Sequence, residues 1–137
     1  MPDTLLAIFV DRFVRRLHVT LHAKAPVFDP ERIGPGGGMI LLTLSEIGAV
    51  SMSELANRLV RDKSQLTRAV QSLERKGFLT RSTLKDDQRV SVVALTPKGV
   101  TMVTTLEGVL AQTIDEVLAP LTQDDKQQLR DLLGRVV

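Results

Sequence analysis

Residues 51–77 read SMSELANRLVRDKSQLTRAVQSLERKG, and this stretch decides the fold. Ser51 with Glu54, and Asp62 with Gln65, have the spacing of capping boxes, in which two side chains bond each other's backbone N–H groups at a helix start. We therefore expect a short helix over 52–60 and a second helix from 63 that lasts until Gly77, because glycine commonly follows a helix C-terminus. Two helices joined by about three residues are typical of a helix-turn-helix.

The second of these helices has two chemically different faces. Leu66, Val70 and Leu73 recur at i, i+4 and i+7, which predicts that they are buried. The opposite face holds hydroxyls, amides and guanidinium groups: Ser64, Gln65, Thr67, Arg68, Gln71, Ser72 and Arg75.

This set of side chains suits DNA. Arginine can fork onto guanine, glutamine onto adenine, and serine or threonine can bind base edges or phosphates. In a helix-turn-helix the N-terminal residues of the second helix lie nearest the bases, which favours Ser64, Gln65, Thr67 and Arg68. The alternative is an ordinary solvated face, although such faces usually contain more Glu and Lys.

After Gly77 the periodicity changes to two, which indicates a β-hairpin over 78–83 and 89–95 with a polar tip at 84–88. Arg81 and Lys85 precede the tip and Arg89 follows it, so we expect a basic ribbon that reaches flanking phosphates or a minor groove. Asp87 would be repelled by phosphate. We expect it to pair with an arginine and orient it.

Helices are predicted on both sides of this region. Residues 4–24 place apolar side chains every four positions, and Pro26, Pro30 and the run 34–38 (GPGGG) predict a loop before a second helix over 39–47. The glycine run lacks the Lys-Ser/Thr of a phosphate-binding loop and is interpreted as a hinge or turn. Thr96 and Pro97 begin another helix that stops by Pro120, and Thr122 caps the last one.

The predicted fold is mainly α with a hairpin, in the order α-α-α-α-β-β-α-α. We expect one domain over 1–137, with a winged helix-turn-helix at 39–99 between flanking helices at 1–25 and 100–137.

Composition supports a globular protein, with 43% hydrophobic and 25% charged residues. The absence of cysteine excludes disulfides, thiolate metal sites and a cysteine nucleophile, and it suits the cytoplasm. The first apolar run ends at Asp11 without a basic region before it, so no secretory signal is predicted. No stretch approaches the ~20 apolar residues of a membrane helix.

Charge is unevenly distributed along the chain. Residues 1–49 carry five basic and five acidic residues, 50–100 carry ten and five, and 101–137 carry three and six. The basic excess in the middle third favours a polyanionic partner, although a solvated basic face without a partner has the same pattern.

Residues 87–99 (DQRVSVVALTPKG) resemble the D-x-R-x-x-x-V-x-L-T-x-x-G wing signature of the multiple antibiotic resistance regulator (MarR) family. Residues 53–56, 63–68 and 73–79 are similar to that family's helix-turn-helix. The resemblance implies a homodimer whose first helix and last two helices interleave with the partner's. It also implies repression of transcription, and release of double-stranded DNA when a small aromatic or phenolic acid binds between the dimerisation and DNA-binding parts.

The terminal helices independently favour a dimer. They carry more apolar surface than a small winged domain needs: Phe9, Phe13, Leu106, Leu110, Ile114, Leu129, Leu132 and Leu133. A second copy would cover these side chains. Alternatively, the helices pack on the back of their own domain. A twofold dimer would place two recognition helices about one DNA turn, roughly 34 Å, apart.

Other functions receive less support. Phe13, Arg16 and His18 are the candidate ligand-binding residues, chosen by position in the first helix. His18 and His22 lie at i, i+4, but no third metal ligand lies near them in sequence, so neither a metal nor a cofactor is predicted. No nucleophile–base pair suggests an enzyme.

The prediction is a ligand-responsive repressor. The alternative is a winged-helix protein-interaction module without DNA binding, which acidic or bulky apolar residues between Ser64 and Arg75 would indicate.

Overall fold

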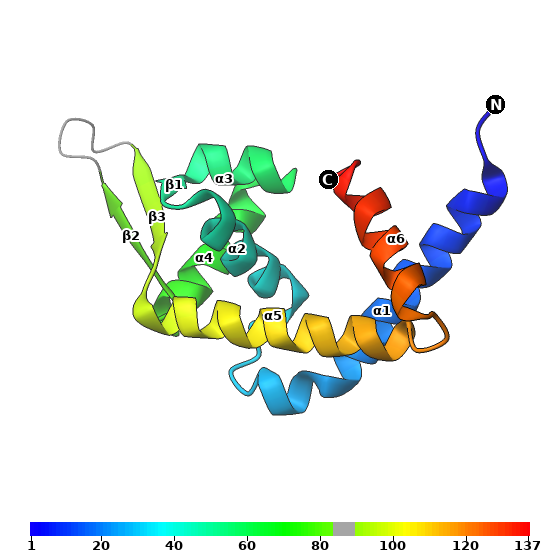
Figure 1. Ribbon diagram of the computed structural model, residues 1–137. Coiled ribbons are helices and arrows are strands. Elements are labelled where there is room, and N and C mark those ends of the chain that lie inside the picture. Colours follow the sequence, from blue (N-terminus) through cyan, green and yellow to red (C-terminus); the bar gives the residue numbers. More distant parts are fainter. Residues whose placement is uncertain (84–89) are drawn as a thin grey trace. The chain divides into compact units, whose positions relative to one another are not determined.

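The computed structural model of this chain describes residues 1–83 and 90–137. These residues are mainly helical and form a small antiparallel sheet (Figure 1). The described elements are α1 (Thr4–Phe28), α2 (Gly34–Ile47), β1 (Val50–Ser51), α3 (Met52–Leu59), α4 (Lys63–Arg75), β2 (Leu79–Thr83), β3 (Ser91–Leu95), α5 (Pro97–Val117) and α6 (Gln123–Gly134). The predicted fold class is confirmed. β1 is an addition, because two residues are too few to show an alternating pattern.

The chain divides into two compact units. Residues 27–107 form what we call the winged unit, which contains α2, α3, α4, the sheet and the first half of α5. Residues 1–26 and 108–137 form the terminal unit, which contains most of α1, the second half of α5, and α6.

The core of the winged unit lies where its helices meet the sheet. Ile40 and Leu41 of α2, Leu55 of α3 and Val93 of β3 have no exposed surface. Burying each such side chain stabilises the fold by about 1.5–3 kcal/mol. The predicted inner face of α4 is confirmed, because its three apolar residues are buried in this cluster: Leu66, Val70 and Leu73.

The sheet connects the wing to the helix-turn-helix. β3 lies between β1 and β2 and pairs antiparallel with both. Val93 is opposite Val50 on one side and Arg81 on the other. Ser51 belongs to β1 and also caps α3, so the start of that helix is fixed to the base of the wing.

Helix α2 begins earlier than predicted, which corrects the interpretation of residues 34–38 as a hinge or turn. Pro35 lies in the first turn, where its missing N–H costs nothing. Gly37 is buried, and a Cβ there would lie 3.0 Å from Cβ of Ile33 and 3.5 Å from Cδ2 of Leu73. The tight approach at Gly37 is therefore to Ile33, just before α2, whereas Leu73 of α4 lies at ordinary contact distance.

Helix α1 also runs further than predicted, through Pro26 to Phe28. Only two residues of the helix follow Pro26, so the hydrogen bond that its missing N–H removes belongs to the last turn. Asp29 follows the helix and is nearly buried. Its carboxylate accepts the N–H groups of Ile33 at 2.8 Å and Gly34 at 3.0 Å, and so holds the start of α2.

The predicted helix caps are present with changed details. Ser51 Oγ accepts the Glu54 N–H at 3.1 Å, and Asp62 Oδ1 accepts the Ser64 N–H at 2.8 Å in place of Gln65. Neither helix forms the reciprocal bond of a capping box within residues 51–65. Gly77 ends α4 with φ of +85°, as predicted.

In the terminal unit, Lys24 Nζ lies 2.8 Å from Glu116 Oε2 and Lys126 Nζ lies 3.0 Å from Asp115 Oδ1. Leu106, which we expected on the dimer surface, is buried in the winged unit, where it faces Gly38. Within residues 1–83 and 90–137, no helix combines the length and hydropathy needed to cross a membrane.

Candidate nucleic-acid interface

The start of α4 is fixed by Asp62. Besides the Ser64 N–H, its Oδ1 accepts the Ser64 hydroxyl at 2.8 Å. The backbone hydrogen bond from Ser64, followed by the side-chain bond, lowers the pKa of Asp62 from its ordinary value. The negative charge of a carboxylate at this position also interacts favourably with the positive end of the helix dipole.

The predicted reading face of α4 points away from the core. Ser64, Gln65, Arg68 and Arg75 are exposed, whereas Thr67, Gln71 and Ser72 are half-buried. The Thr67 hydroxyl donates to the Lys63 carbonyl at 2.8 Å. Because the Ser64 and Thr67 hydroxyl protons are used locally, these two residues are available mainly as acceptors.

The donors on this face are the longer side chains. The side chains of Gln65, Arg68 and Arg75 form no hydrogen bond or ion pair with another residue in the described part of the chain. Glutamine and arginine are the residue types that read adenine and guanine with paired hydrogen bonds. The face can therefore present amide and guanidinium donors to base edges.

A groove of ≈ 400 Å³ lies between α4 and the base of the wing. It brings together two predicted DNA-binding residues, Thr67 and Arg81. Its other lining residues come from the start of α3, the start of α4 and β3: Ser51, Met52, Ser53, Lys63, Val90 and Ser91.

Lys63 and Ser53 are functional candidates that sequence reasoning did not select. Lys63 is the first residue of α4, and Ser53 lies in the first turn of α3. Both are exposed. Its position at the start of the predicted helix could have indicated Lys63. In the structure its ammonium adds a second positive charge, besides that of Arg81, to the groove. Ser53 could not be selected from the sequence, because the pairing of β1, which was not predicted, places the start of α3 at this groove.

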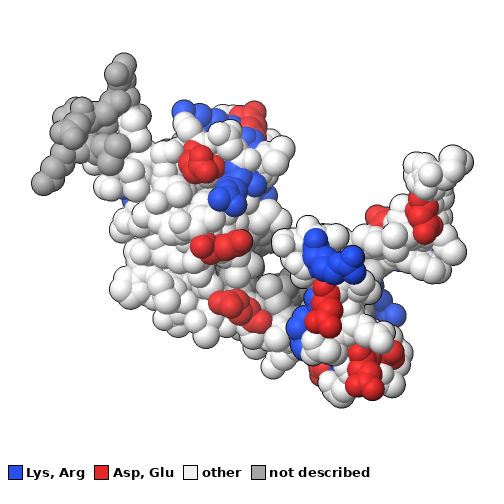
Figure 2. Space-filling model, turned by 45° about the horizontal axis from the view of Figure 1, so that its top comes forward, with Lys and Arg blue, Asp and Glu red and all other residues white. Residues whose placement is uncertain are grey.

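The charges visible on the winged unit are not evenly spread. Figure 2 shows basic and acidic side chains next to one another near the end of this unit where α3 lies, and only acidic side chains further down the same face. Arg58, in the last turn of α3, is one of the exposed basic residues of this unit.

The remaining predicted residues divide into two groups. Lys85, Asp87 and Arg89 lie outside the described residues. Phe13, Arg16 and His18 lie on α1 in the terminal unit, where Phe13 is half-buried and the other two are exposed. In the described chain, no group of three His, Cys, Asp or Glu side chains is arranged to hold a metal ion.

An amphipathic helix that exposes a polar face, follows a short capped helix and is flanked by a two-stranded ribbon defines a winged helix-turn-helix protein. Residues 37–91 match the model of the MarR family. The chain is 28% identical over 134 residues to the HTH-type transcriptional regulator PecS of Dickeya dadantii, a match that covers 96% of this chain and 75% of PecS. Residues 37–91 of this chain therefore resemble the MarR family, and most of the chain is similar to a transcriptional regulator.

Solved structures share the fold. Apo MarR from E. coli has a TM-score of 0.83 and 23% identity, and the match covers 100% of this chain and 97% of MarR. A cysteine-to-serine variant of E. coli MarR complexed with operator DNA has a TM-score of 0.72 and 23% identity, over 96% and 93%.

BpsR from Bordetella bronchiseptica has a TM-score of 0.76 and 18% identity, and the match covers 96% of this chain and 98% of BpsR. Its structure was solved in a study of how 6-hydroxynicotinic acid regulates its DNA binding. At these identities the structures establish the fold. The curated relatives matched are transcriptional regulators and not enzymes, which confirms the prediction that this chain is not an enzyme.

Proposed function

We propose that this protein is a MarR-family repressor that binds a pseudo-palindromic operator as a homodimer and releases it when a small aromatic or phenolic acid binds. One observation carries the DNA-binding part. Helix α4 buries Leu66, Val70 and Leu73 and presents Gln65 and Arg68 outward. A helix held by its apolar face can enter a major groove with its polar face.

The surroundings of α4 support DNA as the ligand. Lys63 and Arg81 add two positive charges at the groove beside the helix start, and phosphate neutralisation by such residues supplies most of the affinity for DNA. The E. coli MarR variant of the same fold was solved with operator DNA. We propose residues 39–99 as the DNA-binding part, with a location in the cytoplasm, where the DNA is accessible.

Uncovered apolar side chains support the homodimer. In α1, Leu5, Leu6 and Phe9 are each more than half exposed, and so is Leu132 of α6. In water such a surface costs free energy until another surface covers it. We propose that the helices within 1–25 and 100–137 pair with those of a second copy, which would present two α4 helices to one DNA site.

The ligand-responsive part rests on residue chemistry. Phe13, Arg16 and His18 combine an aromatic ring, a cation and an imidazole on one helix, groups that suit an aromatic acid. BpsR, a protein of the same fold, is described by the regulation of its DNA binding by 6-hydroxynicotinic acid. A screen of aromatic and phenolic acids by thermal shift tests this part, because a specific ligand raises Tm by mass action.

The decisive experiment titrates the purified chain against the intergenic DNA beside its coding region and against random DNA, at two salt concentrations. We expect sequence-selective binding that weakens as salt rises. Absence of binding at low salt would contradict the proposal and favour a winged-helix protein-interaction module.

The first prediction assigns base reading to Arg68. Arg68→Ala should lower the affinity for the operator more than that for random DNA, because a lost bidentate base contact reduces discrimination by about 1–3 kcal/mol. Arg12→Ala is the matched control, since it removes the same charge from exposed α1. Equal losses on both DNAs would instead assign Arg68 to phosphate binding.

A further inference from the structure

The end of α4 is joined to the start of α5 through three consecutive backbone carbonyls. The Lys76 carbonyl accepts Lys98 Nζ at 2.6 Å, and the Gly77 carbonyl accepts the Thr96 hydroxyl at 2.6 Å. The Phe78 carbonyl accepts the Thr96 N–H at 3.1 Å. Thr96 and Lys98, at the start of α5, therefore bind all three residues that follow α4.

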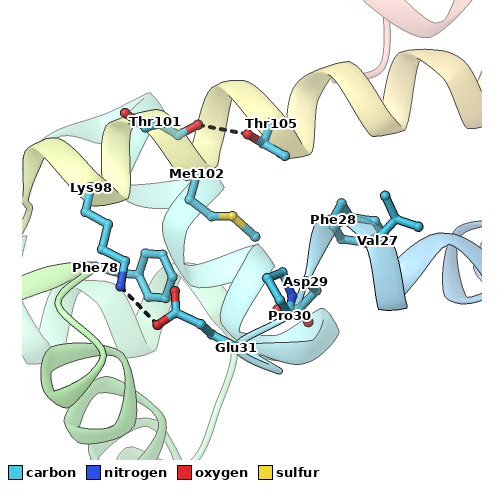
Figure 3. A pocket seen from close by; sticks show the side chains of 10 residues that line it. All are labelled: Val27, Phe28, Asp29, Pro30, Glu31, Phe78, Lys98, Thr101, Met102 and Thr105. Carbon is cyan, nitrogen blue, oxygen red and sulfur yellow. Dashed lines mark hydrogen bonds and ion pairs between the residues drawn. The ribbon is translucent and has the colours of Figure 1, made fainter.

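Lys98 extends this joint to a third segment. Its ammonium lies 3.0 Å from Glu31 Oε1, in the connection between α1 and α2, and 4.5 Å from the centroid of the Phe78 ring. Figure 3 shows Lys98 extending from α5 toward Phe78 and Glu31. Lys76 Nζ also donates to the Arg32 carbonyl at 3.4 Å, so the same connection contacts the end of α4 once directly and once through Lys98.

The position of the ammonium is chemically favourable. A cation at a helix C-terminus satisfies a carbonyl without an intrahelical partner and opposes the negative end of the helix dipole. The Lys98 and Glu31 side chains are 49% and 43% exposed and border a cavity of ≈ 430 Å³. The pair is therefore not part of the buried core, and an exposed pair of this kind adds little to global stability.

We propose that Lys98 is a positioning residue for DNA reading: it holds the C-terminal end of α4 against α5 and the α1–α2 connection, and so sets the direction of the recognition helix. The inference rests on the proposed function. Lys98 acts through the Lys76 carbonyl and Glu31, and it is not assigned a contact with DNA.

The length of α4 explains why a contact at one end affects the other. The helix has 13 residues, which at the usual rise corresponds to ~20 Å. A rotation of ~5° at the C-terminal end would therefore move the first residues of the helix by ~1.7 Å. Hydrogen bonds to base edges require distances within a few tenths of an ångström. A small loosening at Lys98 would thus disturb contacts made by Ser64 and Gln65.

The test uses Lys98→Met, which keeps an apolar stem and removes the ammonium. Affinities for the operator and for random DNA are measured over a range of salt. We expect the ratio of the two affinities to fall by about fivefold, with Tm nearly unchanged. The salt dependence should be unchanged, because no phosphate contact is lost. Lys98→Arg should restore the ratio, since guanidinium can donate to both the carbonyl and Glu31.

Lys126→Met is the matched control. It removes one positive charge and an ion pair of the same length, 3.0 Å, in the terminal unit. This variant should keep the wild-type affinity ratio. If Lys98→Met instead lowers the salt slope by about 0.9 and leaves the ratio intact, Lys98 is a phosphate contact and the proposal is wrong. An unchanged ratio and slope would overturn it as well.

Hydrogen exchange without DNA separates this inference from the proposed function. The Gly77 and Phe78 amides donate to the Glu74 and Leu73 carbonyls at 3.0 Å each. They should exchange several-fold faster in Lys98→Met than in the wild type. If the wild type binds no DNA, the proposed function fails, and exchange alone decides whether Lys98 holds the end of α4. Unchanged exchange would then show that it does not.

Discussion

Val60 has a backbone conformation that β-branched residues rarely adopt. It lies in the turn between α3 and α4 with φ and ψ both at 50°, in the left-handed region. Its side chain is 91% exposed, so packing does not compensate for the strain. For a residue with a Cβ this conformation costs about 1–2 kcal/mol.

Val60→Gly should therefore stabilise the chain. Relief of strain exceeds the larger unfolded-state entropy of glycine, and we expect a net gain of roughly 0.5–1 kcal/mol in the free energy of unfolding. Urea denaturation measures it. Val19→Gly is the control, because Val19 is 71% exposed inside α1, where glycine should destabilise. A destabilised Val60→Gly would show that the valine side chain stabilises the turn.

Gly99 occupies a position where no Cβ fits. A Cβ there would lie 2.0 Å from the Phe78 carbonyl oxygen. The same oxygen accepts the Thr96 N–H, so the joint between α4 and α5 would have to open. Gly99→Ala should lower the free energy of unfolding by about 3 kcal/mol or more, as measured in urea.

Gly108→Ala, on the same helix, should have the opposite effect on the free energy of unfolding. Gly108 is exposed within α5, and a Cβ there would meet nothing within 4 Å. The change should stabilise by about 0.5–1 kcal/mol. Equal effects of the two substitutions would mean that helix propensity, and not the close approach at Phe78, decides the effect at Gly99.

At the scale of elements, sequence reasoning succeeded where periodicity and caps agree. The spacing of Leu66, Val70 and Leu73 predicted the buried face of α4, and Gly77 predicted its end. It failed for residues 34–38, because glycine and proline suggested a turn, whereas Gly37 and Gly38 are buried within α2. Burial against distant segments leaves no local pattern, and β1 was too short to leave one.

The N-cap of α4 makes its stability depend on pH. The Ser64 hydrogen bonds lower the pKa of Asp62, so the folded state favours its charged form. This stabilisation is complete above the unfolded pKa of about 3.9 and is lost as pH falls through the lower folded value. Asp62→Ala should lower Tm at neutral pH, and its difference from wild type should narrow below pH about 4.

Asp124→Ala is a suitable control for this titration. Asp124 also lies in the first turn of a helix, but within the described chain its carboxylate accepts no helix N–H. Its substitution should change Tm at neutral pH much less. A Tm difference for Asp62→Ala that persists unchanged to pH about 3 would show that the cap does not act through a charged carboxylate.

For the whole molecule, the sequence predicted the two faces of α4 but not all that surrounds this helix. The polar face of α4 follows from one helical period. Lys63 and Ser53 join Arg81 at one groove only because β1 pairs with β3. The apolar character of Leu106 predicts a place on the dimer surface, yet this side chain is only 8% exposed and lies near Gly38 inside the winged unit.

The proposed homodimer is a property of the whole molecule, and Phe9 tests it. Phe9 is 55% exposed in α1, so Phe9→Asp removes little packing within one chain. We expect the wild type to sediment at twice the 15.1 kDa of one chain and Phe9→Asp to shift toward the monomer. Operator affinity should fall by more than about tenfold, because two linked recognition helices gain from effective concentration.

Met39→Asp is matched to this change, since Met39 is 52% exposed and lies in α2, outside the segments 1–25 and 100–137 that are proposed to pair. It introduces the same charge in place of a similarly exposed apolar side chain, and it should sediment like the wild type. A monomeric Met39→Asp or a dimeric Phe9→Asp would move the interface away from α1. A monomeric wild type at micromolar concentration would contradict the dimer itself, and binding to a two-half-site operator would then require another explanation.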